Sequence, residues 1–193
     1  MTKTQNKDIL IVGVGGQGTL LASRILGNLA ISLGYDVKLS EVHGMAQRGG
    51  SVVTHVRYGE KVYAPTIDEA GADIIVAFEK LEAYRWIGKL KKDGKVFVNT
   101  QEIAPMPVIT GAVKYPENIE ASIKESVPNA VFVDALSIAR EAGNAKAVNT
   151  VLIGVLAKYI DIEKEAFIDA IKKTVPERFL DINLVAFEKG YNS

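Results

Sequence analysis

A glycine-rich segment near the N-terminus has the residue types and the spacing of an anion-binding turn. It reads Gly13-Val-Gly-Gly-Gln-Gly18 and directly follows a short apolar run. Glycines permit positive φ angles and close approach to the backbone, and the start of a following helix supplies free N–H groups. The spacing fits a dinucleotide fingerprint, but also a tight turn that only packs or that contacts another chain's ligand. The candidate contacts are Gly13, Gly15, Gly16, Gln17 and Gly18.

A second glycine-rich segment, residues 41–51, carries polar side chains between its glycines. Arg48 could pair with a carboxylate or a phosphate through two hydrogen bonds. His43 could serve as a general acid or base, as a neutral donor, or only structurally. Glu41 ends an expected strand, roughly where a ribose-binding acid would lie. The candidate contacts here are Glu41, His43, Gln47, Arg48 and Gly49.

Two further polar residues stand beside apolar runs. Asn149 lies on an apolar, helical stretch, and a buried asparagine needs partners. It either ties that helix to the glycine loops or contacts a ligand. Glu79 follows an expected strand and either reaches the same cleft or serves as a charge at a helix N-terminus.

The elements that position these residues alternate between strand and helix. Expected strands are Asp8–Val12, Asp36–Val42, Ser51–Arg57, Asp73–Phe78, Lys95–Asn99 and Val131–Val133. Expected helices are Gln17–Leu33, Glu79–Leu90, Glu117–Ser126, Asp134–Ala142, Ala147–Ile160, Glu163–Lys173 and Phe179–Lys189. A turn at 58–60 predicts a hairpin that returns along residues 61–63. The pattern predicts one domain, residues 1–193, folded as a three-layer α/β/α sandwich with a Rossmann-like, mostly parallel but mixed sheet.

Composition excludes several classes of function. The 23 Lys and Arg residues balance 23 Asp and Glu residues, so we expect no nucleic-acid partner. The chain has no cysteine, so it cannot ligate an iron–sulfur cluster through thiolates or use a Cys nucleophile. With two histidines, we expect no metal site. The longest uncharged run, Ile9–Ser23, is too short and too rich in glycine to span a membrane, and we expect a cytoplasmic protein.

Three segments in order carry a resemblance to a known family. They are Gly13-Val-Gly-Gly-Gln-Gly18, Ser40-Glu-Val-His-Gly-Met-Ala-Gln-Arg-Gly-Gly-Ser51 and Asn149-Thr-Val-Leu-Ile-Gly154. Together they closely resemble the γ-type subunit or domain of the 2-oxoacid:ferredoxin oxidoreductases. The likeness spans essentially the whole chain.

The resemblance implies a heteromeric enzyme that oxidatively decarboxylates an arylpyruvate such as indolepyruvate, with coenzyme A as acyl acceptor and ferredoxin as electron acceptor. Thiamine diphosphate, magnesium and the iron–sulfur clusters would reside on a large α subunit, with no cofactor in this chain. The isolated chain would be inactive, and it could form a homodimer. Two alternatives stay open at this point: a stand-alone NAD(P)-binding reductase and a pure scaffold subunit.

Overall fold

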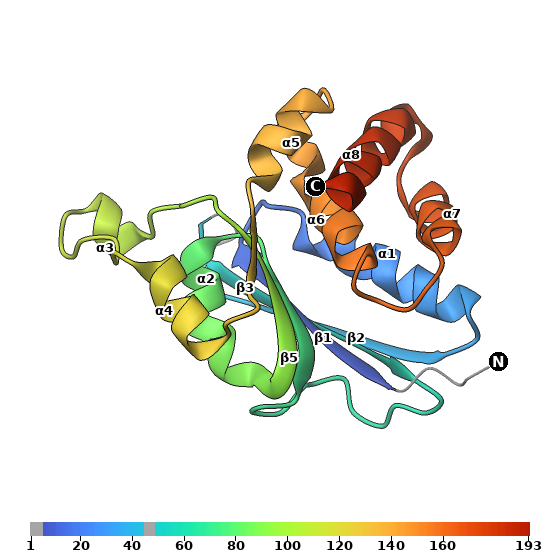
Figure 1. The fold of residues 1–193 in the computed structure, drawn as a ribbon, viewed down its shortest axis with the longest axis horizontal. Helices are drawn as coiled ribbons and strands as arrows, with labels where there is room; N and C mark the ends of the chain where they lie inside the picture. The colour runs from blue at the N-terminus through green and yellow to red at the C-terminus, as the bar shows by residue number, and fades with distance from the viewer. Residues whose placement is uncertain (1–5, 45–48) are drawn as a thin grey trace.

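The computed structural model describes residues 6–44 and 49–193, which form one six-stranded sheet between layers of helices (Figure 1). The strands are β1 (Lys7–Val14), β2 (Asp36–His43), β3 (Ser51–Gly59), β4 (Ala72–Ala77), β5 (Leu90–Asn99) and β6 (Val131–Val133). Their order across the sheet is β2-β3-β1-β4-β5-β6. β3 is antiparallel to both of its neighbours, whereas β1, β4, β5 and β6 pair in parallel. The expected mixed, mostly parallel sheet is therefore confirmed.

The prediction of a hairpin around residues 58–60 is wrong, because residues 61–63 do not form its second strand. β3 pairs with β2 along one edge and with β1 along the other, so no edge is free for a returning strand. Residues 61–63 instead begin a loop that runs to β4. The hairpin that does form pairs β2 with β3. A local turn signal cannot distinguish these two pairings, because either neighbouring strand would form the same kind of backbone ladder with an edge of β3.

Helices cover both faces of the sheet. Five helices pack on one face: α1 (Thr19–Ser32), α5 (Ala135–Glu141), α6 (Val148–Ala157), α7 (Lys164–Thr174) and α8 (Leu180–Asn192). Two pack on the other: α2 (Lys80–Trp86) and α4 (Ile119–Ser126) (Figure 1). Successive residues of a strand point to opposite faces, so Ile9 and Ile11 enter the first core while Leu10 and Val12 enter the second.

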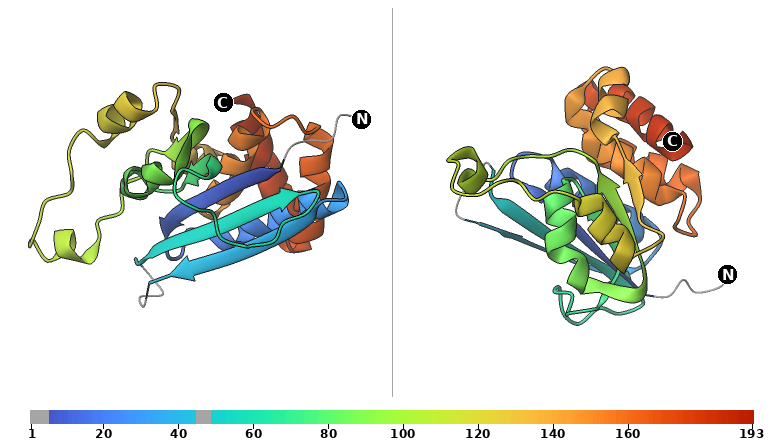
Figure 2. Two further views of the ribbon diagram at one scale, coloured as in Figure 1. Left: turned by 90° about the horizontal axis from the view of Figure 1, so that it is seen from below. Right: turned by 60° about the vertical axis from the view of Figure 1, so that its left-hand side comes forward.

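The remaining elements are short. Single 3₁₀ turns occupy Ile87–Lys89, Ala145–Ala147 and Glu177–Phe179, and α3 (Met106–Ile109) is one helical turn. Figures 1 and 2 show α3 at the end of a long connection that projects away from the sandwich. No helix in the described part of the chain is long and apolar enough to cross a membrane.

Candidate functional site

The glycine turn follows β1 without a break, because this strand runs further than expected and includes Gly13 and Val14. Gly16 and Gly18 have φ angles of +100° and +85°. These angles lie in the left-handed region, which glycine adopts without strain. Gly18 is also the residue that caps the N-terminus of α1, so the turn ends where the helix starts. The expected strand–turn–helix unit is confirmed.

The side chain of Gln17 bridges the crevice between the ends of β1 and β4. Its Oε1 accepts the Val14 N–H at 2.8 Å, and its Nε2 donates to the Phe78 carbonyl at 2.9 Å. Nε2 also lies 3.4 Å from Oε1 of Gln101. Because α1 and α2 leave this part of the sheet on opposite faces, the crevice is the place where an open α/β sheet usually binds its ligand. Here a carboxamide of the chain itself bridges the ends of the two strands.

The second glycine segment pairs with the turn. The Gly15 N–H donates to the Gly50 carbonyl at 2.8 Å, and the Gly49 N–H donates to the Gly15 carbonyl at 3.4 Å. The two loops thus form one surface at the carboxyl edge of the sheet. Gln47 and Arg48 lie outside the described residues.

Glu41 and His43 lie farther from the turn, on the edge strand β2. Across the sheet His43 pairs with Val52, which pairs in turn with Gly13. Two strand spacings amount to about 10 Å. The exposed Glu41 carboxylate accepts the Thr54 hydroxyl at 3.1 Å. The structure therefore brings the turn, Gly49 and Asn149 together and leaves these two residues at the edge.

This geometry disfavours a dinucleotide at the turn. The N–H groups of Val14 and Gly15, which would face a pyrophosphate, already donate within the chain. In the fingerprint, the acid that binds the ribose ends the strand next to β1. Here the antiparallel β3 occupies that position and Glu41 is one strand beyond it. The backbone of Gly16 is exposed, and no atom of the described residues beyond its chain neighbours lies within 4 Å of where its Cβ would be, which suits the close approach of another chain.

Asn149 ties α6 to the glycine turn. The residue is buried at the start of α6, and its Nδ2 donates to the Gly18 carbonyl at 3.5 Å. Its Oδ1 accepts the N–H of Thr150 at 2.8 Å, which holds the amide in place. A Cβ at Gly18 would lie 2.8 Å from Nδ2. The first of the two roles expected for Asn149 is thus present in the structure.

We expect Gly18→Ala to destabilise the chain more than Gly16→Ala does. Both substitutions force alanine into the left-handed region, at about 1–2 kcal/mol. Only Gly18→Ala also pushes against Asn149, since a Cβ at Gly16 meets nothing within 4 Å among the residues that the structure describes. Urea unfolding of both variants, of Asn149→Ala and of the Gly18→Ala/Asn149→Ala double variant checks this. A coupling energy below about 0.3 kcal/mol between the two sites would contradict the contact.

Glu79 anchors the connection between β5 and α4 to the same edge of the sheet. It is 1% exposed and caps α2, where its Oε2 accepts the Glu82 N–H at 2.9 Å. Its Oε1 accepts the Ile103 N–H at 3.1 Å and the Tyr115 hydroxyl. Burial, followed by the hydrogen bond to this carboxylate, raises the pKa of Tyr115, so the phenol stays protonated and donates. The second role expected for Glu79, a charge at a helix N-terminus, is the one observed.

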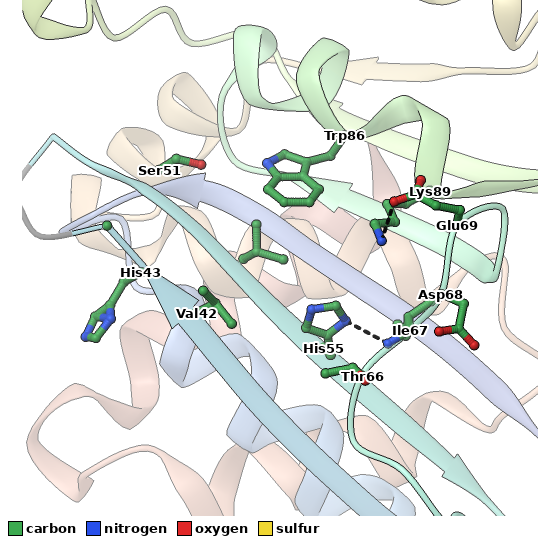
Figure 3. Close-up of a pocket in the computed structure, with 12 residues that line it drawn as sticks. Val42, His43, Ser51, His55, Thr66, Ile67, Asp68, Glu69, Trp86 and Lys89 are labelled. Atoms are coloured by element: carbon green, nitrogen blue, oxygen red, sulfur yellow. Dashed lines mark hydrogen bonds and ion pairs between the residues drawn. The ribbon is translucent and has the colours of Figure 1, made fainter.

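A groove of about 650 Å³ lies on the α2 face of the sheet, beside β2 and β3 (Figure 3). Its floor is His55, whose Nδ1 accepts the Ile67 N–H at 3.0 Å. Burial, with smaller contributions from the Lys89 and Arg57 cations, lowers the pKa of His55, which favours a neutral imidazole. Trp86 forms the wall, and its buried Nε1–H has no partner in the described structure. His43 lies at the rim with its imidazole turned away from the groove (Figure 3).

The charges of the groove do not suit a phosphate. Its described cation, Lys89, is paired with Glu69 at 2.7 Å, and Asp68 adds a second carboxylate. No group of three or more His, Cys, Asp or Glu side chains within the described ranges is placed to hold a metal ion.

Several residues of this region were not expected from the sequence. Gln101 could have been found from the sequence, because it follows the end of β5 and polar residues at the ends of parallel strands gather at one edge of the sheet. Tyr115 and His55 could not have been found in this way, since the packing of loops brings them to their partners, Glu79 and Ile67.

Comparison with known proteins places this arrangement in a family. Residues 8–193 match the model of the pyruvate ferredoxin/flavodoxin oxidoreductase family. The chain belongs to this family. It is 43% identical to the indolepyruvate oxidoreductase subunit IorB of Pyrococcus horikoshii, over 95% of this chain and 93% of that protein. It is also 32% identical to the ketoisovalerate oxidoreductase subunit VorA of Methanothermobacter marburgensis, over 94% of this chain but only 35% of that longer protein.

A solved structure supports the fold. The pyruvate oxidoreductase subunit PORC of Thermotoga maritima superimposes with a TM-score of 0.72 over 98% of this chain and 97% of that chain, at 24% identity. The comparisons confirm the expected family and the expected role as small subunit of a 2-oxoacid:ferredoxin oxidoreductase.

Proposed function

We propose that this chain is the small subunit of an indolepyruvate:ferredoxin oxidoreductase, which converts an arylpyruvate to an acyl-coenzyme A with release of carbon dioxide and transfer of two electrons to ferredoxin. The observation that carries the proposal is the similarity to subunit IorB over nearly the full length of both chains. It supports one functional unit over residues 1–193. The cytoplasmic location expected from the cysteine-free sequence is part of the same proposal.

The proposal assigns the redox chemistry to the large partner subunit. Thiamine diphosphate with magnesium would supply the decarboxylation there, and iron–sulfur clusters would carry the electrons. This chain has no cysteine to ligate such a cluster. The N–H groups of Val14 and Gly15 already donate to Gln17 and Gly50 within the chain, which supports a role in assembly over a role as a separate nucleotide-binding reductase.

The two glycine loops are the part of this chain that we propose to face the active site of the complex. The turn at Gly13, Gly15, Gly16, Gln17 and Gly18 would present backbone to the partner chain or to coenzyme A. Gly49 would add backbone beside it, and Glu41, His43, Gln47 and Arg48 would add polar side-chain contacts, with Glu41 and His43 farther out on β2. Asn149 would hold the turn from behind. Charged and amide side chains on glycine loops suit an acyl carrier with phosphate groups or a polar interface.

Reconstitution tests the proposal. We expect the purified chain to show no indolepyruvate-dependent reduction of ferredoxin, and the activity to appear when the large subunit, thiamine diphosphate, magnesium and coenzyme A are added. Calorimetry of the lone chain with NAD(H) and NADP(H) is the companion measurement. Turnover by the lone chain, or micromolar binding of either dinucleotide, would falsify the subunit assignment in favour of the reductase.

A further inference from the structure

The connection between β5 and α4 forms a preorganised arm, residues 103–115. Its turn, α3, is held by hydrogen bonds from the Ile109 N–H to the Pro105 carbonyl at 3.0 Å and from the Thr110 N–H to the Met106 carbonyl at 2.9 Å. Gly111, with a φ of +77°, ends it. A single helical turn is not stable in water by itself. The arm nevertheless has a defined shape.

The tip of the arm is apolar and unburied. Met106, Ile109 and Val113 are 64%, 65% and 55% exposed. Residues 103–113 carry no charge, and none of residues 103–114 belongs to either hydrophobic core of the described structure. Figures 1 and 2 show the arm standing clear of α2 and α4 from different directions. An ordered apolar projection of this kind is typical of a protein–protein contact, in which methionine adapts to its partner's surface.

The base of the arm is fixed at the candidate site. One carboxylate, that of Glu79, binds both ends of the arm, through the Ile103 N–H at 3.1 Å and the Tyr115 hydroxyl. Gln101, just before the arm, contacts Gln17 of the glycine turn through its side chain. The arm therefore emerges from the same edge of the sheet as the glycine loops, and a chain that covers those loops also meets the arm.

We infer that residues 103–115 are a docking arm for the large subunit, which receives Met106, Ile109 and Val113 in an apolar groove. The inference rests on the proposed function. In the relative VorA this domain is about a third of a longer chain, so the family contains cases where it is covalently joined to the rest of its protein. The uncharged tip between Glu102 and Lys114 fits an apolar groove with charged groups only at its rim.

Binding between the separately purified subunits tests the arm. We expect Met106→Glu/Ile109→Glu to weaken the affinity for the large subunit by at least about tenfold, since two charges would enter an apolar groove. The matched control is Val185→Glu on α8, a residue 46% exposed on the opposite helical layer, which should bind like the wild type. Circular dichroism should show unchanged folding for all variants, and Met106→Ala/Ile109→Ala should give a smaller loss of affinity.

The possible outcomes distinguish a failure of the docking arm from a failure of the proposed function. If the wild type binds the large subunit and the glutamate variant binds equally well, the arm is not the docking element although the proposed function stands. If the variant loses only self-association of this chain, the arm serves a second copy and the inference is overturned. If the wild type does not bind the large subunit at all, the proposed function itself fails.

Discussion

Gly154→Ala should destabilise this chain more than Gly18→Ala or Gly16→Ala does. Gly154 of α6 lies against the α8 backbone: a Cβ would lie 2.8 Å from the Tyr191 nitrogen and still closer to the Phe187 carbonyl. Both neighbours are backbone atoms, so the strain cannot be relieved by a rotamer change. The two helices would have to separate, and every residue of α6 is buried. We expect a loss of about 3 kcal/mol or more in the free energy of unfolding.

A thermal melt measures this effect. At this chain length, a loss of that size lowers Tm by about 6–12 °C. Gly190→Ala, on the facing helix, should behave alike, because its Cβ would meet the Val151 carbonyl. The matched control is Gly88→Ala: Gly88 is exposed, and a Cβ there meets nothing within 4 Å in the described part of the chain. Equal melting temperatures for Gly154→Ala and Gly88→Ala would show that the α6–α8 contact is looser than the structure has it.

Glu79→Ala should have the second-largest effect, on stability and on assembly together. The substitution leaves three donors without their acceptor: the N–H groups of Glu82 and Ile103 and the hydroxyl of Tyr115. A buried polar group without a partner costs about 1–3 kcal/mol, so we expect a loss of about 3 kcal/mol in total. Because both ends of the arm are then released, affinity for the large subunit should also fall.

The control is a glutamate on the same connection that is not buried. Glu102 is 54% exposed and pairs at 2.6 Å with Lys80, which also lies 3.5 Å from Glu120 and so keeps a second carboxylate when Glu102 is removed. Such pairs contribute about 0–1 kcal/mol, so Glu102→Ala should change the urea midpoint little. The two readouts should be taken below the melting temperature of each variant. If Glu79→Ala binds the large subunit with wild-type affinity, the carboxylate does not position the arm, whatever its effect on stability.

The sequence was sufficient for the order of the six strands and of the longer helices, and for the location of the candidate loops, but not for α3 or for the absence of a strand at 61–63. Apolar runs such as 8–12 and 73–78 are short, end at glycine or a charge, and alternate with amphipathic stretches, so their type follows from local periodicity. Gly13–Gly18 and Gly49–Gly50 also stand out locally, because few residue types tolerate the backbone angles of such turns.

Only the tertiary structure decided which strands pair and which side chains and loops contact one another. Whether β3 pairs with β1 or with a returning strand depends on which edge is free, and that is settled by the whole sheet. The sequence made Gln17 a candidate ligand contact. The structure shows that its side chain donates a hydrogen bond to the carbonyl of Phe78, a residue far along the chain. The same holds for Glu79 and Tyr115, since a buried carboxylate acquires its partners from loops whose paths no local pattern specifies. The residue types determine which side chains can donate or accept hydrogen bonds. Which partners they find depends on long-range packing of the chain.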